Sequence, residues 1–288
     1  MIPFDLETTG VDPKTARPVT GFACVVNADP EAETHRWGDS QWLIDPGVEI
    51  PEGATEKHGI TTAHARESGV SSESGVRSMT RRLVELVTLE GLSPPHLCDL
   101  FSCGEWDDPA TLFEFTESHE VKPAVTAPIV GMNVAYDLTI MHRDALRHGV
   151  MSLVEITKTL NLTVPCIDVY VLDKHVDPYR KGFRNLGALC ETYRVPLDNA
   201  HNAEADALAT ARVAVRLGMW SPYLAEMPIL TLHDNQVGWR RTQCVNLQAY
   251  FRRSGKKDAV VDPCWPVCLP ENHPEEMTDA ILGLFDNG

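Results

Sequence analysis

The stretch Phe4-Asp5-Leu6-Glu7-Thr8-Thr9-Gly10 decides the fold class of this chain. Its apolar and acidic side chains alternate, which is typical of a β-strand with one face in the core. Residues two apart on a strand project to the same face, so Asp5 and Glu7 are predicted to point into one pocket. Carboxylate oxygens are preferred ligands of Mg2+ and Mn2+, so this pair can share a metal ion. An acidic pair alone is more often merely solvated, so the interpretation depends on partners elsewhere in the chain.

A second acidic motif, 131–137 (GMNVAYD), follows a short apolar strand predicted at 127–130. Apolar residues at helical spacing predict a helix from 133 to 147, with Asn133 and Asp137 four apart on one face. A lone aspartate on a helix is usually solvated. Here a strand leads directly into the motif, and that context favours a functional carboxylate.

The third motif, 201–207 (HNAEADA), stands at the start of a strongly periodic helix predicted at 203–217. An imidazole is suited to accept a proton from water near neutral pH, and Asp206 follows His201 by five residues. A histidine before a helix and an aspartate on it are common in isolation. The order of the three motifs along one chain favours a shared site.

The rest of the pattern predicts a mixed α/β domain. Residues 1–50 are predicted to form three strands, because apolar β-branched runs alternate with turn signals. Helices are predicted at 75–89 and 185–193, and a strand or strand-to-helix passage at 166–172. Strands in hairpins followed by strands that alternate with helices indicate a mixed sheet with helices packed on it.

Together the three motifs resemble those of the DEDDh (DnaQ-like) 3′–5′ exonucleases, the family of the proofreading epsilon subunit of bacterial DNA polymerase III. Residues 42–61 and 185–197 are also similar to segments of that family, so the resemblance covers about 1–218. It implies a ribonuclease-H-like α/β fold, in which three antiparallel strands and then two parallel ones form a five-stranded mixed sheet with helices on both faces. A bacterial or bacteriophage protein of replication or repair is the implied context.

The resemblance also implies an activity, the metal-dependent release of nucleoside 5′-monophosphates from the 3′ end of DNA, most readily single-stranded. Two divalent ions, Mg2+ or Mn2+, would serve the hydrolysis. Asp5 would bridge both ions, Glu7 and Asp206 would complete the site of the hydrolytic ion, and Asp137 would support the second. His201 would be the general base.

The expected substrate contacts come from the motifs and from a basic, aromatic segment at 177–184. The predicted binding residues are Thr8, Thr9, Gly10, His58, Ile60, Asn133, Tyr136, Tyr179, Arg180, Lys181 and Arg184. His58 has an alternative role as a helix-capping residue. The segment 177–184 has an alternative as a plain basic loop.

Two other functions remain open. The same kind of site can cut RNA, because only contacts with the sugar distinguish the 2′-hydroxyl, so a 3′–5′ exoribonuclease is the alternative within enzymes. A catalytically silent subunit that binds nucleic acid or a polymerase is the alternative outside enzymes. Such a subunit would be expected to have lost at least one residue of the predicted site, and all of them are present.

Composition excludes some classes of protein. The 288 residues carry a formal net charge of −16, which argues against a protein that coats nucleic acid through lysine and arginine. No apolar run approaches the ~18–20 residues that cross a membrane, and the first residues do not read as a secretory signal. We therefore expect no membrane partner and a cytoplasmic protein.

The eight cysteines are scattered, as expected in a reducing compartment, and most are predicted to be small core residues. Cys264 and Cys268, with His273, suggest a zinc site only weakly, because the spacing is not the usual C-x2-C.

Beyond the exonuclease domain at 1–218, which contains an acidic insertion at 91–122, we predict a helical extension at 219–270 and an acidic tail at 271–288. The segment 239–253 is predicted to be an amphipathic helix that either supports the domain or extends a DNA track. Residues 282–285 weakly resemble the peptides by which replication proteins bind a sliding clamp.

Overall fold

The computed structural model describes residues 1–27, 36–88 and 124–269. The predicted insertion at 91–122, the tail at 271–288 and His273 lie outside the described residues. No helix in the described part combines the length and the apolar character needed to cross a membrane.

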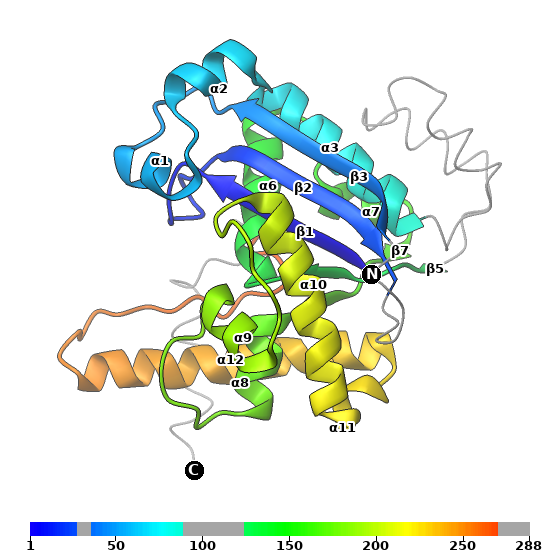
Figure 1. Cartoon of the computed structure of the whole chain (residues 1–288), viewed down its shortest axis with the longest axis vertical. Helices are drawn as coiled ribbons and strands as arrows, with labels where there is room; N and C mark the ends of the chain where they lie inside the picture. The colour runs from blue at the N-terminus through cyan, green and yellow to red at the C-terminus, as the bar shows by residue number, and fades with distance from the viewer. Residues whose placement is uncertain (28–35, 89–123, 270–288) are drawn as a thin grey trace.

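A mixed sheet of six strands forms the centre of the fold, in the order β4-β3-β2-β1-β6-β8 (Figure 1). Its strands are β1 (Ile2–Thr8), β2 (Pro18–Val26), β3 (Arg36–Asp45), β4 (Val70–Ser71), β6 (Ile129–Gly131) and β8 (Cys166–Asp168). Strands β1, β2 and β3 pair antiparallel, whereas β6 and β8 continue the sheet in parallel from β1. The predicted pattern of three antiparallel and two parallel strands is present. The predicted count of five is wrong by one, because β4 adds a two-residue parallel edge to β3.

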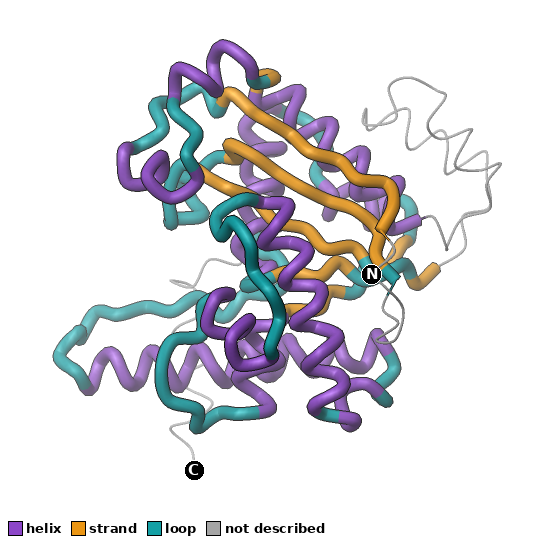
Figure 2. Tube along the Cα trace, in the orientation of Figure 1, coloured by secondary structure: helices purple, strands orange, loops and turns teal. Residues whose placement is uncertain are grey.

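Helices cover both faces of the sheet (Figure 2). Helix α10 (Ala203–Trp220) packs on β1, β2 and β6 from one side, and α3 (Ser72–Thr88) and α6 (Val134–His148) pack on the other. The alternation of β1 decides which residues face which layer. Phe4 and Leu6 lie in the core on the side of α3 and α6, so Asp5 and Glu7 face the side of α10.

Small residues bring α10 close to the sheet. Phe22, Cys24 and Val26 of β2 form a buried cluster with three alanines of α10, namely Ala203, Ala207 and Ala211. Alanine side chains allow a helix backbone to approach a strand closely. The first turn of α10, which carries Asp206, is thereby held beside the acidic face of β1.

The remaining elements lie around this core. They are α1 (Glu52–His58), α2 (Thr62–Ser68), α7 (Leu153–Thr159), α8 (Val169–Val176), α9 (Leu186–Tyr193), α11 (Pro222–Ala225), α12 (Ile229–Arg253) and a separate strand pair, β5 (Ala124–Val125) with β7 (Leu162–Thr163). Each predicted helix is found, and apart from α12 its bounds are shifted by only a few residues.

Helix α12 is longer than the predicted helix at 239–253, and it packs on α8 and β8. Its buried side chains are Leu232, Gln236 and Cys244. The apolar face predicted for 239–253 consists of Trp239, Val245, Leu247, Tyr250 and Phe251. Of these, Tyr250 is 58% exposed, so that part of the prediction is wrong. The packing agrees with a supporting role for α12, and a role of its basic residues in a DNA track stays a prediction.

A proline is normally avoided inside a central strand, which predicts that β1 begins only at Phe4. That prediction is wrong, because β1 begins at Ile2 and includes Pro3. The chain before the proline is held on both sides, since Ile2 N donates to Pro128 O at 2.8 Å and Val26 N donates to Met1 O at 3.0 Å.

Candidate active site

Three of the predicted site residues form a tight group. Ligand atoms of Glu7, His201 and Asp206 all lie within 4.8 Å of one another. Glu7 comes from β1, and Asp206 from the first turn of α10. His201 is exposed, stands two residues before the helix with a φ of 68°, and donates its backbone N–H to Asp206 Oδ2 at 3.2 Å. The turn before α10 therefore places the imidazole close to the carboxylates of Glu7 and Asp206.

Asp5 and Asp137 lie close enough to this group to interact with it through their charges. Asp137 is in the first turn of α6 and is 3% exposed. Burial raises the pKa of Asp5 well above its usual range, and the charges of Asp137, Asp206 and Glu7 raise it further. Burial is also the main reason why the pKa of Asp137 and that of Asp206 are raised. All four predicted carboxylates therefore share one electrostatic environment.

This environment suits a divalent cation. Mutual repulsion of half-buried carboxylates is relieved by a bound positive charge. Asp206 Oδ1 is buried and has no hydrogen-bond partner among the described residues, which leaves an oxygen available to an ion. A donor set of carboxylate oxygens with one imidazole fits Mg2+ or Mn2+.

The pKa of Glu7 predicts a pH-dependent stability. The pKa of Glu7 is raised from 4.5 to about 7, mainly by burial and also by the charge of Asp206, while Lys57 opposes the shift. Between these two pH values the folded protein binds more protons than the unfolded chain, so the stabilising effect is complete below pH 4.5 and is lost as the pH rises through 7. We expect Glu7→Gln to stabilise the metal-free protein at pH 8 by about 1–2 kcal/mol, a value reduced for the partial exposure of Glu7.

Thermal unfolding in chelator at pH 5 and at pH 8 measures this effect. The matched control is Glu73→Gln, because Glu73 is an exposed helix carboxylate paired only at the surface with Arg77. It should change the stability by less than about 0.5 kcal/mol at either pH. In excess Mg2+ the parent should instead be more stable than Glu7→Gln, since the ion stabilises the protein that binds it. The same pH dependence in Glu7→Gln and parent would contradict the prediction.

Residues of the first motif are tied to α6. The hydroxyl oxygens of Tyr136 and Thr8 are hydrogen-bonded at 2.7 Å. The Tyr136 hydroxyl also donates to the carbonyl of Gly10. Thr9 is buried, and its hydroxyl accepts a hydrogen bond from Arg17 N at 3.0 Å. The side chains of Thr9 and Tyr136 therefore hold the loop after β1 in place. Their predicted contacts with substrate, like those of Thr8 and Gly10, stay predictions.

His58 lies at the end of α1, as its predicted capping role requires, and its predicted contact with substrate stays a prediction. It is the last residue of α1, and its Nδ1 accepts a hydrogen bond from Ile60 N at 3.1 Å, so it does cap that helix end. Burial lowers its pKa, the carbonyl of Thr8 opposes this, and the nearby His201 lowers it again. His58 thus lies beside the site. Ile60 packs on the small apolar cluster that includes Val19.

Asn133 precedes α6 instead of belonging to it. Its φ of 61° is left-handed, a conformation that asparagine tolerates better than most residues. Its backbone N–H donates to Asp168 Oδ1 at 3.0 Å. The prediction that Asn133 and Asp137 share a helical face is wrong for this reason, since only Asp137 is helical.

Asp168 is a residue of the site region that the sequence reasoning missed. Its carboxylate is fully buried and accepts hydrogen bonds from Asn133 N, from Tyr170 N at 3.0 Å and from Trp265 Nε1 at 3.2 Å. Asp168 therefore joins the start of α6, which carries Asp137, to α8 and to the C-terminal segment. The available signal was an acidic residue at the end of a short apolar strand, directly before a helix.

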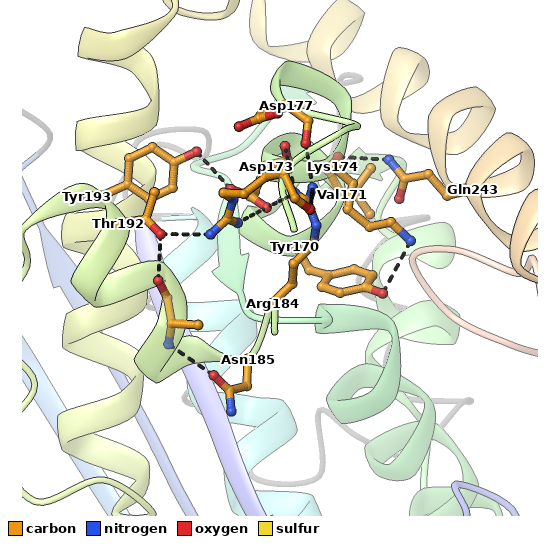
Figure 3. A network of polar contacts seen from close by, with 12 residues as sticks. Tyr170, Val171, Asp173, Lys174, Asp177, Arg184, Asn185, Thr192, Tyr193 and Gln243 are labelled. Atoms are coloured by element: carbon orange, nitrogen blue, oxygen red, sulfur yellow. Dashed lines mark hydrogen bonds and ion pairs between the residues drawn. The ribbon is translucent and has the colours of Figure 1, made fainter. Parts of the chain in front are cut away.

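Both arginines that were predicted to bind substrate, Arg180 and Arg184, form ion pairs within the fold. Arg180 and Arg184 both pair with the buried carboxylate of Asp173 on α8, the former at 2.5 Å, and Tyr193 donates to the same carboxylate at 2.8 Å (Figure 3). By contrast, Tyr179 is 91% exposed, and Lys181 is exposed as well. The predicted contacts of Tyr179 and Lys181 with substrate stay predictions.

Asp173→Ala should destabilise the protein by about 3–5 kcal/mol, because it leaves two partly buried arginines without their shared anion. The control is Asp177→Ala, an exposed residue at the end of the same helix, which should cost less than about 0.5 kcal/mol. Urea unfolding of the two variants gives both free energies. A cost below about 1 kcal/mol for Asp173→Ala would show that the arginines find other partners.

No family model matches the chain. Among curated proteins, the PolC-type DNA polymerase III of Lacticaseibacillus paracasei is 30% identical over 112 residues, which are 39% of this chain and 7% of that protein. The chain thus spans a small part of that relative.

Solved structures of E. coli Exonuclease I share the fold. In its complex with a dT13 oligonucleotide the TM-score is 0.52 at 18% identity, covering 78% of this chain and 42% of that one. A second Exonuclease I structure, described as suggesting how processivity is achieved, has a TM-score of 0.53 at 18% identity, covering 86% and 45%. The chain therefore spans less than half of the length of these proteins, and the likeness shows a common fold.

Proposed function

We propose that this chain is a 3′–5′ exonuclease of the DEDDh type that acts on DNA and depends on Mg2+ or Mn2+. The observation that carries the proposal is the convergence of Glu7, His201 and Asp206 within 4.8 Å, beside the charges of Asp5 and Asp137. These five residues come from three distant parts of the sequence. Burial of so many acidic groups in one place is costly unless a cation balances them.

In this proposal Asp5, Glu7, Asp137 and Asp206 hold two divalent ions. The bound ions would stabilise negative charge at the scissile phosphate and ease the deprotonation of water. The imidazole of His201 accepts a proton from the attacking water, whose oxygen forms the new bond to phosphorus. The bond from phosphorus to the 3′ oxygen breaks, and a nucleoside 5′-monophosphate leaves.

DNA is proposed as the substrate because the Exonuclease I structures of the same fold hold DNA oligonucleotides. The exposed Tyr179 and Lys181 would contribute a stacking surface and a charge to the strand.

Digestion of matched oligonucleotides tests the proposal. Purified protein would be incubated with DNA and RNA of one sequence, single- and double-stranded and labelled at the 5′ end, with Mg2+, Mn2+ or chelator. We expect a ladder of products shortened from the 3′ end of single-stranded DNA, with release of mononucleotides and none in chelator. Preference for RNA would reassign the substrate, and no cleavage with either metal would favour a silent binding subunit.

A further inference from the structure

A second group of ligand-type side chains lies far from the carboxylates in sequence, in the segment 261–268 that follows α12. We call this segment the strap. Val261 N donates to Gln248 Oε1 of α12 at 3.0 Å, and Cys268 N donates to Thr139 Oγ1 of α6 at 2.8 Å. The strap therefore runs back along α12 and ends against α6 (Figure 1).

Three residues of the strap bring ligand atoms together. A carboxylate oxygen of Asp262 and the sulfurs of Cys264 and Cys268 all lie within 4.8 Å of one another. Ligand atoms at ~2.0–2.3 Å from one tetrahedral zinc ion lie about 3.3–3.8 Å apart, so side-chain shifts of about 1 Å or less would bring all three onto one ion. The direct contact of Cys268 Sγ with Asp262 Oδ2 at 2.7 Å shows how closely the groups converge.

The surroundings fix these groups in place. Cys264 N donates to Asp262 Oδ1 at 2.8 Å, and Cys244 of α12 donates its thiol to the Asp262 carbonyl at 3.2 Å. Cys268 is 7% exposed, and so is Trp265 between the two cysteines. Two converging thiols, of which that of Cys268 is buried and that of Cys264 half-buried, form with the carboxylate an ordered donor set, in contrast to acidic residues gathered at a surface.

We propose that Asp262, Cys264 and Cys268 bind one Zn2+ ion, with water in the fourth tetrahedral position. Two thiolates select a soft or borderline cation such as Zn2+ and disfavour Mg2+ and Mn2+, which suit the oxygen-rich group at β1. The ion would cross-link the two ends of the strap and so fix it between α12 and α6. Its role is structural and does not depend on the proposed nuclease activity.

Cobalt substitution tests the site, because thiolate ligands give Co2+ a charge-transfer absorption in the near ultraviolet that oxygen ligands do not. The full chain, kept reduced with a phosphine and stripped with chelator, would be titrated with Co2+ and then with Zn2+. We expect one equivalent of thiolate-bound Co2+, which Zn2+ displaces. The double variant Cys264→Ser with Cys268→Ser should lose this absorption, whereas Cys24→Ser with Cys190→Ser should keep it.

Two further measurements cover a failure of the double variant to fold. Asp262→Asn keeps both thiols and should weaken Co2+ binding at least about tenfold, as loss of one of three protein ligands implies. Zn2+ at about a hundredfold excess over the Kd of the parent should raise the melting temperature of the parent by about 5–10 °C and that of Asp262→Asn by about half as much or less. A Co2+ spectrum without thiolate absorption, absorption that persists in the double variant, or a Cys264–Cys268 disulfide in the reduced protein would overturn the proposal.

Discussion

Asp206→Asn is expected to lower the rate of DNA digestion by about 10³-fold or more, which corresponds to ~4 kcal/mol of barrier. The amide keeps the size of the side chain but removes a negative ligand from the centre of the group with Glu7 and His201. The fold should survive, because the substitution also removes a charge that repels Asp5 and Glu7. We expect an unchanged or slightly higher melting temperature in chelator.

Glu204→Gln is the matched control for this experiment. Glu204 lies in the same helical turn, but its carboxylate is engaged by Arg36 at 2.6 Å and by Gln41 at 2.5 Å. It should retain the rate within about threefold, since an exposed ion pair contributes ~1 kcal/mol or less. Digestion rates and Mn2+ affinity would be measured for both variants. More than a tenth of the parent rate in Asp206→Asn would refute the assignment of the site.

His201→Asn is expected to lower the rate about 10²–10⁴-fold, the usual contribution of a general base. Asparagine is chosen because His201 has a φ of 68°, which asparagine adopts with less strain than alanine. The backbone N–H that donates to Asp206 is retained. If His201 is the base, the rise of the parent rate with pH around neutrality should be absent from the variant.

Metal affinity separates two roles of this histidine. Its imidazole lies within ligand distance of Glu7 and Asp206, so it could also coordinate an ion. If His201 acts only as a base, the affinity for Mn2+ should be almost the same in His201→Asn as in the parent. A rate that returns to the parent value at saturating Mn2+ would instead assign it as a ligand, and an unaltered pH profile would show that another group takes the proton.

The parts of the fold that the sequence predicted are those with a local pattern. Strand β1 alternates apolar and acidic residues, and α10 has a helical period, so both elements could be predicted from their patterns. The meeting of Glu7 with Asp206 was implied by the resemblance of the motifs to those of a known family. Strand β4 has only two residues and exists through its pairing with β3, which no periodicity indicates. A two-residue edge strand of this kind forms only because a neighbouring strand is there to pair with it, so its own sequence does not predict it.

The parts that were missed depend on partners distant in sequence. Arg180 and Arg184 looked available for a nucleic acid because the sequence does not show that Asp173, on the preceding helix, is buried between them. Asp168 lies 97 residues from Trp265, its hydrogen-bond partner. Buried polar groups are satisfied by whatever the tertiary fold brings near, so local patterns cannot assign them.

The contacts of Asp168 have a consequence for where this protein can be cut. The resemblance to exonucleases ends near residue 218, yet Gln236 accepts the N–H of Asp168 at 2.8 Å and Trp265 binds its carboxylate. In a fragment that stops at 218, the buried carboxylate of Asp168 would lose the hydrogen bond from Trp265. The apolar side chains that pack against Leu232 would also be exposed to solvent. The folding unit around the carboxylates is thus larger than the three motifs, so a cut within the extension is expected to destabilise the start of α6.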